Sequence, residues 1–374
     1  NTKMAIKVNG TTVINDSRAL TNIASVDATT VAALGSAGVG GGATVVSSLP
    51  ASGSNGDIVY NTSDLHYYGW NNFKSAWELF LLESAPGPNT ASGSQIFTSS
   101  GSFIVPSGVY NFSVVAVGHG GMYPNGNALG GGAGGGALGY ANLVACVPND
   151  VFVVIIGQAI GTAAATGRIT SVNPLGKAEI VKVEGGQNGT LGYPTAVSGS
   201  GGTVIIGTGG SGGDGGNVSI NYSAGGCGGA GGYSGNGGTG GKSLSSGLVN
   251  ATNGSGGGGG GSPASRSTGG HAHGGNGGGG VGLLGQGSNG APSGPSAIRG
   301  PSATSPHGTG GSGGGNGVGA IHGGNPSGTG GQYGGGGGRF ATVGSGNSGQ
   351  NSAVRFVWKS GAAGTSYFPS TNVS

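Results

Sequence analysis

Charged residues are scarce in this chain of 374 residues, where they make up 6% of the sequence, against about a quarter in ordinary globular domains. With ten carboxylates in total, few acid–base pairs can form, and no Ser, His and Asp setting for a nucleophile stands out. No Gly-x-Gly-x-x-Gly pattern follows a strand with an acid about 20 residues further on, as a dinucleotide site needs. The sequence therefore predicts a protein that is not an enzyme and uses no cofactor.

Long apolar runs and cysteines are also few. No stretch approaches the roughly 18 apolar residues of a membrane span, so no membrane insertion is expected. No signal peptide is recognisable either, because residues 5–34 alternate in polarity and carry charges. The two cysteines, Cys146 and Cys227, either form one bridge or stay as small buried thiols, and we expect free thiols.

Acids are nearly missing from the second half of the chain, where the only acid after Glu184 is Asp214, against six basic residues. This excess is a weak bias towards anionic surfaces such as phosphorylated glycans, and it is too dilute for a nucleic-acid partner. Four histidines of the same half have no Cys, Asp or Glu at ligand spacing, so no metal site is predicted; they are His271, His273, His307 and His322.

Glycine is abundant in this chain, with 98 residues. It is densest between residues 201 and 338, in runs that read Gly-Gly-x. A period of three matches neither an α-helix nor a strand, but it matches the three-residue turn of polyproline II, which has no internal hydrogen bonds. The N–H and C=O groups of each run must then pair with neighbouring runs. We expect a bundle or layered sandwich of polyglycine II helices, in which the third residue of a triplet, such as Cys227 or Ala230, is the one that needs room.

Disorder is the alternative, because glycine (98 residues) and proline (15) together reach the roughly 30% share typical of disordered low-complexity chains. Regular strand signals on both sides of the glycine runs favour a folded structure. Collagen is excluded, since the runs lack proline at the triplet positions and their phase is repeatedly broken.

The first 85 residues are predicted to form two small β modules. Residues 1–45 are interpreted as an attachment or trimerisation segment with a hairpin that turns at Asn9-Gly10. Residues 46–85 are interpreted as a small β-hairpin module. Its aromatic side chains, Trp70, Trp77 and Tyr67, either form the core of that hairpin or stack on a sugar, and the core is the favoured interpretation.

After a linker at residues 86–89, residues 95–374 are predicted to form one glycine-rich domain. Residues 110–117 alternate as a half-buried strand, and residues 217–222 read as a short strand. Another strand at 353–358 closes the domain, so the glycine runs are inserted between strands of a β platform that supplies apolar burial. The predicted fold class is mainly β with a polyglycine II bundle and almost no α-helix.

Several segments resemble glycine-rich tail-fibre proteins of phages. The sequence F-I-V-P-S-G-V at 103–109, followed by F-S-V-V-A-V-G at 112–118, resembles the opening of such domains, and residues 147–157 resemble their second strand pair. The ending, A-V-R-F-V-W at 353–358 with S-Y-F-P-S-T-N at 366–372, is similar to the tail of structural proteins of marine myoviruses, especially those of cyanobacteria. Lys359-Ser360 after Trp358 and the added N-terminal modules depart from that pattern.

The resemblance implies a virion tail-fibre protein with a core like that of receptor-binding adhesins on T-even-like long tail fibres, whose loops between glycine helices touch the host. Homotrimers, other tail-fibre proteins and a host outer-membrane protein or surface glycan are the implied partners. The candidate loops here are residues 242–253, 262–268, 281–307 and 321–327. Their candidate receptor-binding residues, with tyrosines at run ends, are Tyr233, Lys242, Leu248, Arg266, Leu283, Leu284, Arg299, His307 and Tyr333.

Other interpretations stay open at this stage. The same residues can simply cap the bundle, and the chain can be a self-assembling extracellular matrix protein outside any virion. An ice-binding role needs a flat row of Thr or Ala, and the mixed residues at the triplet positions disfavour it.

Overall fold

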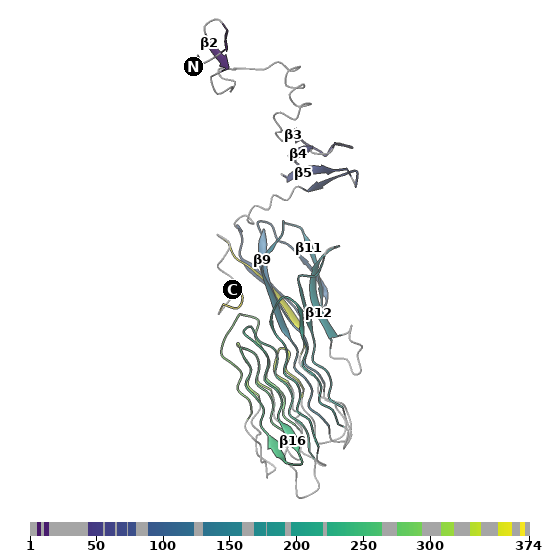
Figure 1. The fold of residues 1–374 in the computed structure, drawn as a ribbon, viewed down its shortest axis with the longest axis vertical. Coiled ribbons are helices and arrows are strands. Elements are labelled where there is room, and N and C mark those ends of the chain that lie inside the picture. The colour runs from purple at the N-terminus through teal and green to yellow at the C-terminus, as the bar shows by residue number, and fades with distance from the viewer. Residues whose placement is uncertain are drawn as a thin grey trace, which may run out of the picture. The chain divides into compact units, whose positions relative to one another are not determined.

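The computed structural model divides the chain into two compact units, Asn1–Ala85 and Pro86–Ser374 (Figure 1). The boundary falls at the start of the predicted linker, and the predicted division of the first 85 residues into two modules stays a prediction. The structure describes residues 6–8, 11–14, 44–54, 57–63, 66–72, 74–79, 89–122, 130–158, 168–176, 178–190, 196–219, 223–263, 275–293, 308–317, 330–337, 351–360 and 367–370.

The first unit contains a hairpin and a four-stranded sheet. The hairpin pairs β1 (Ile6–Val8) with β2 (Thr11–Ile14) in antiparallel fashion, as predicted, and its expected turn residues, Asn9 and Gly10, lie outside the described residues. The strands of the sheet, in spatial order, are β3 (Thr44–Val46), β4 (Ile58–Asn61), β5 (His66–Asn71) and β6 (Ala76–Leu79). Trp70 and Trp77 meet edge to face with ring centroids 5.3 Å apart and enclose Gly53, which agrees with the core interpretation for these two rings, whereas Tyr67 is 41% exposed and does not fit it.

Two five-stranded sheets open the second unit. The first, in spatial order, consists of β15 (Thr208–Gly210), β10 (Leu138–Ala145), β9 (Asn111–Val117), β18 (Ala353–Trp358) and β7 (Gly93–Phe97). The second consists of β14 (Val204–Ile206), β13 (Val181–Glu184), β12 (Ile169–Pro174), β11 (Val151–Ile155) and β8 (Gly101–Ile104). β18 pairs with β7 and β9, so the last strand closes the sheet that the first strands open, as predicted.

The sheets pack face to face through aromatic side chains. Phe103 of β8 stacks on Phe356 of β18 with ring centroids 4.0 Å apart, and Phe112 of β9 meets Phe152 of β11 edge to face at 4.9 Å. All four rings are buried. Each such side chain removes a large apolar surface from water, so this sandwich holds the apolar burial that the glycine runs lack.

Strands β9 and β18 of the first sheet are buried on both faces. Phe112 and Val114 of β9 face the sandwich, whereas Val115 and Val117 join a second cluster with residues of the glycine runs, such as Ala230. The predicted strand at residues 110–117 is confirmed as β9, but the expectation that it is half-buried was wrong, because all of β9 is buried. The reason is that the glycine runs cover the outer face of this sheet, where the alternation predicts solvent.

The glycine runs lie side by side in Figure 1 as wavy extended traces that reach from the sheets towards β16. The run 225–232 shows how they bond, because all eight of its N–H groups donate to other segments. Residues three apart share an acceptor run: 225, 228 and 231 donate to 130, 133 and 136; 226, 229 and 232 donate to 241, 238 and 235; 227 and 230 donate to 276 and 279. The period of three and the bonding between runs are those of polyglycine II.

Each central run is surrounded by others. The carbonyls of run 225–232 accept bonds from three further segments, at 213–216, 258–261 and 336, so the run has six bonded neighbours. Adding a Cβ to Gly228 would place it 1.8 Å from the Gly213 oxygen, and at Gly135 2.0 Å from the Gly229 oxygen. Where a triplet position is not glycine, its side chain is small: Ala133, Cys227 and Ala230 are completely buried.

Side chains replace missing neighbours at the rim of the bundle. Asp214 Oδ1 accepts from the Gly201 amide at 2.8 Å, and Asn236 Oδ1 accepts from the Ser211 amide at 3.0 Å. Thr252 Oγ1 accepts from the Thr239 amide at 2.8 Å. Polar side chains of neighbouring segments thus satisfy outward backbone donors at the rim.

The fold class is confirmed, since the described residues contain strands in several sheets and no helix. Accordingly, none of the described segments has the helix length and hydropathy needed to span a membrane. Cys146 and Cys227 are both buried and free, one in the sandwich cluster and one among the glycine runs. The predicted strand at 217–222 shows only a bridge at Val218 in its described part.

Candidate binding sites

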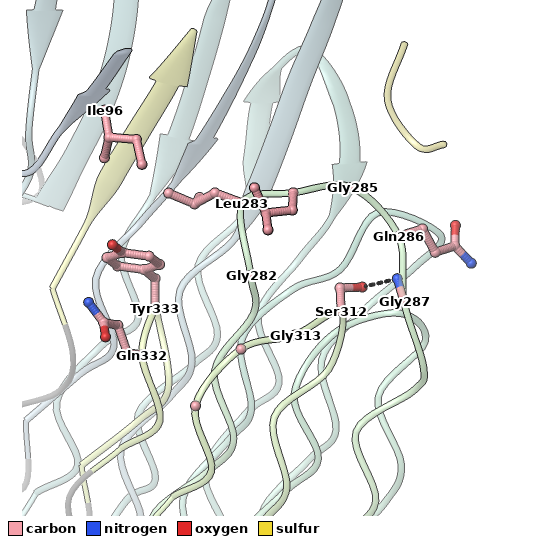
Figure 2. A pocket seen from close by; sticks show the side chains of 13 residues that line it. Ile96, Gly282, Leu283, Gly285, Gln286, Gly287, Ser312, Gly313, Gln332 and Tyr333 are labelled. Atoms are coloured by element: carbon pink, nitrogen blue, oxygen red, sulfur yellow. Dashed lines mark hydrogen bonds between the residues drawn. The ribbon is translucent and has the colours of Figure 1, made fainter. Parts of the chain in front are cut away.

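A pocket of about 400 Å³ opens where the edge strand β7 meets the ends of several glycine runs (Figure 2). We call it the junction pocket. Ile96 and Tyr333 lie at one end of the view with Gln332 beside them, and the hydrogen bond from the Gly287 amide to Ser312 Oγ, 3.0 Å long, marks the other. The lining residues are Ile96, Gly282, Leu283, Leu284, Gly285, Gln286, Gly287, Ser312, Gly313, Gly314, Gly315, Gln332 and Tyr333.

One wall of the pocket, the segment 282–287, is held from beneath by two buried side chains. The Tyr233 hydroxyl donates to the Gly282 carbonyl at 3.0 Å and accepts from the Gly285 amide at 3.3 Å. The Arg355 guanidinium donates to the Leu283 carbonyl at 3.1 Å. Because these bonds fix three backbone groups between Gly282 and Gly285, the wall is set before any ligand arrives.

Tyr233 and Arg355 sit in a dry environment. Both are 3% exposed, and burial raises the pKa of the Tyr233 hydroxyl and lowers the pKa of the Arg355 guanidinium. The Tyr233 ring stacks on Phe368 with centroids 5.4 Å apart, and the Phe368 ring lies 5.8 Å from that of Tyr140. The tyrosine therefore stays protonated at neutral pH and keeps the hydroxyl that bonds to the wall.

The structure corrects the expected exposure of two candidate residues. Tyr233 and Leu283 were predicted to contact a receptor, but they are 3% and 5% exposed and belong to the cluster beneath the first sheet. Leu284 is 54% exposed, and Tyr333 packs one side on the same cluster while it lines the pocket. The junction pocket thus unites Leu283, Leu284 and Tyr333, with Tyr233 as their support.

Two other candidates lie on a hairpin at the opposite end of the glycine runs, marked by β16 in Figure 1. β16 (Lys242–Leu244) and β17 (Gly247–Val249) form this hairpin within a segment that was predicted as a loop. Lys242 is exposed, and Leu248 and Val249 are 37% and 44% exposed. Apolar side chains at the free end of a bonded scaffold suit contact with another molecule.

The remaining candidates, Arg266, Arg299 and His307, lie outside the described residues. So do the other histidines considered for a metal, at 271, 273 and 322. Among the residues that the structure places, no group of three or more His, Cys, Asp or Glu side chains comes together.

Sequence reasoning missed several residues of the junction pocket. Ile96 was expected only as part of a strand. Its place on an edge strand depends on the pairing of β7 with β18, in which Arg355 lies opposite Ile96. The sequence did mark Arg355 as unusual, because it is a charged residue on the same strand face as the apolar Ala353 and Val357. Ser312 and Gln332 had no signal, since they are ordinary polar residues in glycine runs.

Neither the comparison with protein-family models nor that with curated proteins finds a match for this chain.

Proposed function

We propose that this protein is a tail-fibre tip protein of a phage and acts as an adhesin that binds a bacterial surface receptor through loops between its polyglycine II runs. In this proposal it is part of the virion, works outside the cell, and catalyses no reaction. Its partners are other tail-fibre proteins and a host outer-membrane protein or surface glycan. The resemblance of residues 103–118 and 353–372 to such proteins supports this assignment.

The observation that carries the proposal is the β16–β17 hairpin. It joins two glycine runs and exposes Leu248 and Val249 at the end of the bundle away from the sandwich. Backbone bonds between Ser243 and residues 217 and 219, of 3.0 and 2.9 Å, tie it to a third run. Exposed apolar residues on an anchored loop bind without a large cost of ordering.

Assembly as a homotrimer is the second part of the proposal. Among the side chains of the first unit whose burial the structure describes, Val59 is the single buried hydrophobic one, whereas Val45 and Tyr67 are 68% and 41% exposed. A sheet with so little core is marginal alone, and association with copies of itself would bury these side chains. Mass photometry over a dilution series should show a discrete trimer; open-ended polymers would favour a self-assembling matrix protein instead.

The adhesin proposal is tested with fluorescently labelled full-length protein on a panel of cyanobacterial and other Gram-negative strains. At least one strain should bind the protein in a saturable way. The double variant Leu248→Asp and Val249→Asp should lose at least about tenfold in affinity, since apolar contacts at the centre of an interface contribute most to binding. The matched control is Leu175→Asp, an exposed leucine in a turn of the sandwich.

Two results would overturn the proposal. The first is equal binding by the hairpin variant and the native protein on every strain that binds. The second is the absence of saturable binding to any strain of the panel by protein that circular dichroism shows to be folded.

A further inference from the structure

The junction pocket is a second candidate site, remote from the hairpin, with its own chemistry. Ile96 and Leu284 expose about half of their surfaces, at 51% and 54%, beside the partly buried ring of Tyr333. Gln332, Gln286 and Ser312 add amide and hydroxyl groups to this apolar lining. The volume of about 400 Å³ lies in the range of small-molecule sites, which combine an apolar lining with a few polar groups.

The support beneath the pocket indicates that its shape is specified. Burying a guanidinium is costly unless it is hydrogen-bonded, and Arg355 is buried with one of its bonds made to the wall at the Leu283 carbonyl. The same wall receives both bonds of the Tyr233 hydroxyl. In addition, the backbone N–H of Gln286 donates a hydrogen bond to the Pro369 carbonyl at 2.9 Å, which fixes the wall there. A preformed wall lowers the ordering cost of binding.

We propose that the junction pocket binds a neutral saccharide unit, such as a hexose or an N-acetylhexosamine. No charged side chain of the described residues lines the pocket, which disfavours anionic and cationic ligands because their desolvation would not be compensated. A sugar ring has an apolar C–H face and a polar rim. Tyr333, Ile96 and Leu284 suit that face, and the Gln332 amide can both donate to and accept from hydroxyls.

The main competing ligand is an apolar side chain of a partner protein. Such a side chain would leave the exposed Gln332 amide of the lining facing a dry contact, at a cost in desolvation. A sugar meets the apolar and the polar parts of the lining together. This inference does not depend on receptor binding by the hairpin, since the two sites share no residue.

Saturation-transfer NMR on the full chain tests the proposal. The probes are glucose, galactose, N-acetylglucosamine and N-acetylgalactosamine, with glucuronate and glucosamine as charged counterparts and N-acetylleucine amide as the apolar competitor. At least one neutral sugar should show transfer from the protein and a dissociation constant in the millimolar range or below. Leu284→Asp should weaken binding of the neutral sugar at least tenfold, and Gln332→Ala should weaken it at least threefold; both positions are exposed.

The matched control is Leu175→Asp in a turn of the sandwich, outside both candidate sites, which should leave sugar binding unchanged. The proposal would be overturned if the control variant lost sugar binding, or if Leu284→Asp bound the sugar as well as the native protein does. It would also be overturned if the charged sugars showed transfer as strong as that of the neutral sugars, or if only N-acetylleucine amide showed transfer. The absence of transfer to every neutral sugar would overturn it too. Unchanged cell adhesion by the hairpin double variant, with sugar binding intact in the native protein, would instead count against the hairpin site alone, so the two proposals fail separately.

Discussion

The sandwich and the glycine bundle both have buried interiors, but side chains fill the interior of the sandwich and main chains fill the interior of the bundle. In the sandwich, side chains such as Phe103 and Phe356 fill the space between the two stacked sheets. In the bundle, the backbones of runs such as 225–232 touch directly and bond on all sides. One region is stabilised mainly by apolar burial and the other by hydrogen bonds and close contact between main chains.

This difference teaches where each region tolerates change. An apolar core accepts other side chains of similar volume at modest cost. The bundle has no such freedom, because the space that a side chain would need is occupied by the carbonyl of the next run, as at Gly228 and Gly135. The same substitution should therefore have very different effects in the two regions.

Gly228→Ala should have the largest effect. Its Cβ would lie 1.8 Å from the Gly213 oxygen, and the run cannot move aside without breaking bonds such as Gly228 N–H to the Ala133 carbonyl. We expect a loss of more than about 4 kcal/mol in the free energy of unfolding, a size reserved for such severe disruptions. Thermal unfolding and amide hydrogen exchange of the glycine runs measure it.

The control is Gly101→Ala at an exposed position of the edge strand β8, where the new Cβ would meet Phe97 at an ordinary 3.5 Å. This change should be neutral or stabilise by up to about 1 kcal/mol, because alanine restricts the unfolded chain. Similar losses in both variants would show that close packing between runs does not distinguish the bundle.

The sequence predicts the local rules of the bundle but not its layout. The triplet period indicates bonding between runs, and it marks Cys227 and Ala230 as positions that need room; both are completely buried. Which run lies beside which cannot be predicted, because one Gly-Gly-x run offers the same donors and acceptors as another. The neighbours of run 225–232 therefore come from segments as far apart as 130 and 336.

The candidate sites show the same division. Leu248 was correctly expected to be exposed, because it lies between two glycine runs. Tyr233 was expected at the surface of a run end, and it is buried because Phe368, far along the sequence, stacks on it. A contact of that kind depends on how the chain closes the first sheet, which no local pattern reveals.

Phe356→Ala should have the next largest effect and sharpen the contrast from the sandwich side. The ring is fully buried, stacks on Phe103 at 4.0 Å and meets Phe112 at 5.2 Å. Its removal should cost about 3–5 kcal/mol through lost burial and the cavity left behind. Phe356→Leu should cost less than half as much, since it retains most of the volume. Equal losses for the two variants, measured by urea unfolding, would contradict the view that this core tolerates conservative change.

Asp214→Ala should have the smallest effect, because it removes a rim contact and leaves the interior of the bundle intact. Asp214 Oδ1 accepts from the Gly201 amide at 2.8 Å on the exposed side of the run. Water can replace this acceptor, so the loss should be about 0.5–1.5 kcal/mol, the usual net value of one hydrogen bond. Asp214→Asn keeps an acceptor oxygen and should retain most of the stability. If thermal unfolding shows Asp214→Ala to be as damaging as Gly228→Ala, the rim side chains are as essential as the glycine contacts, and the distinction between a close-packed interior and a solvent-replaceable rim fails.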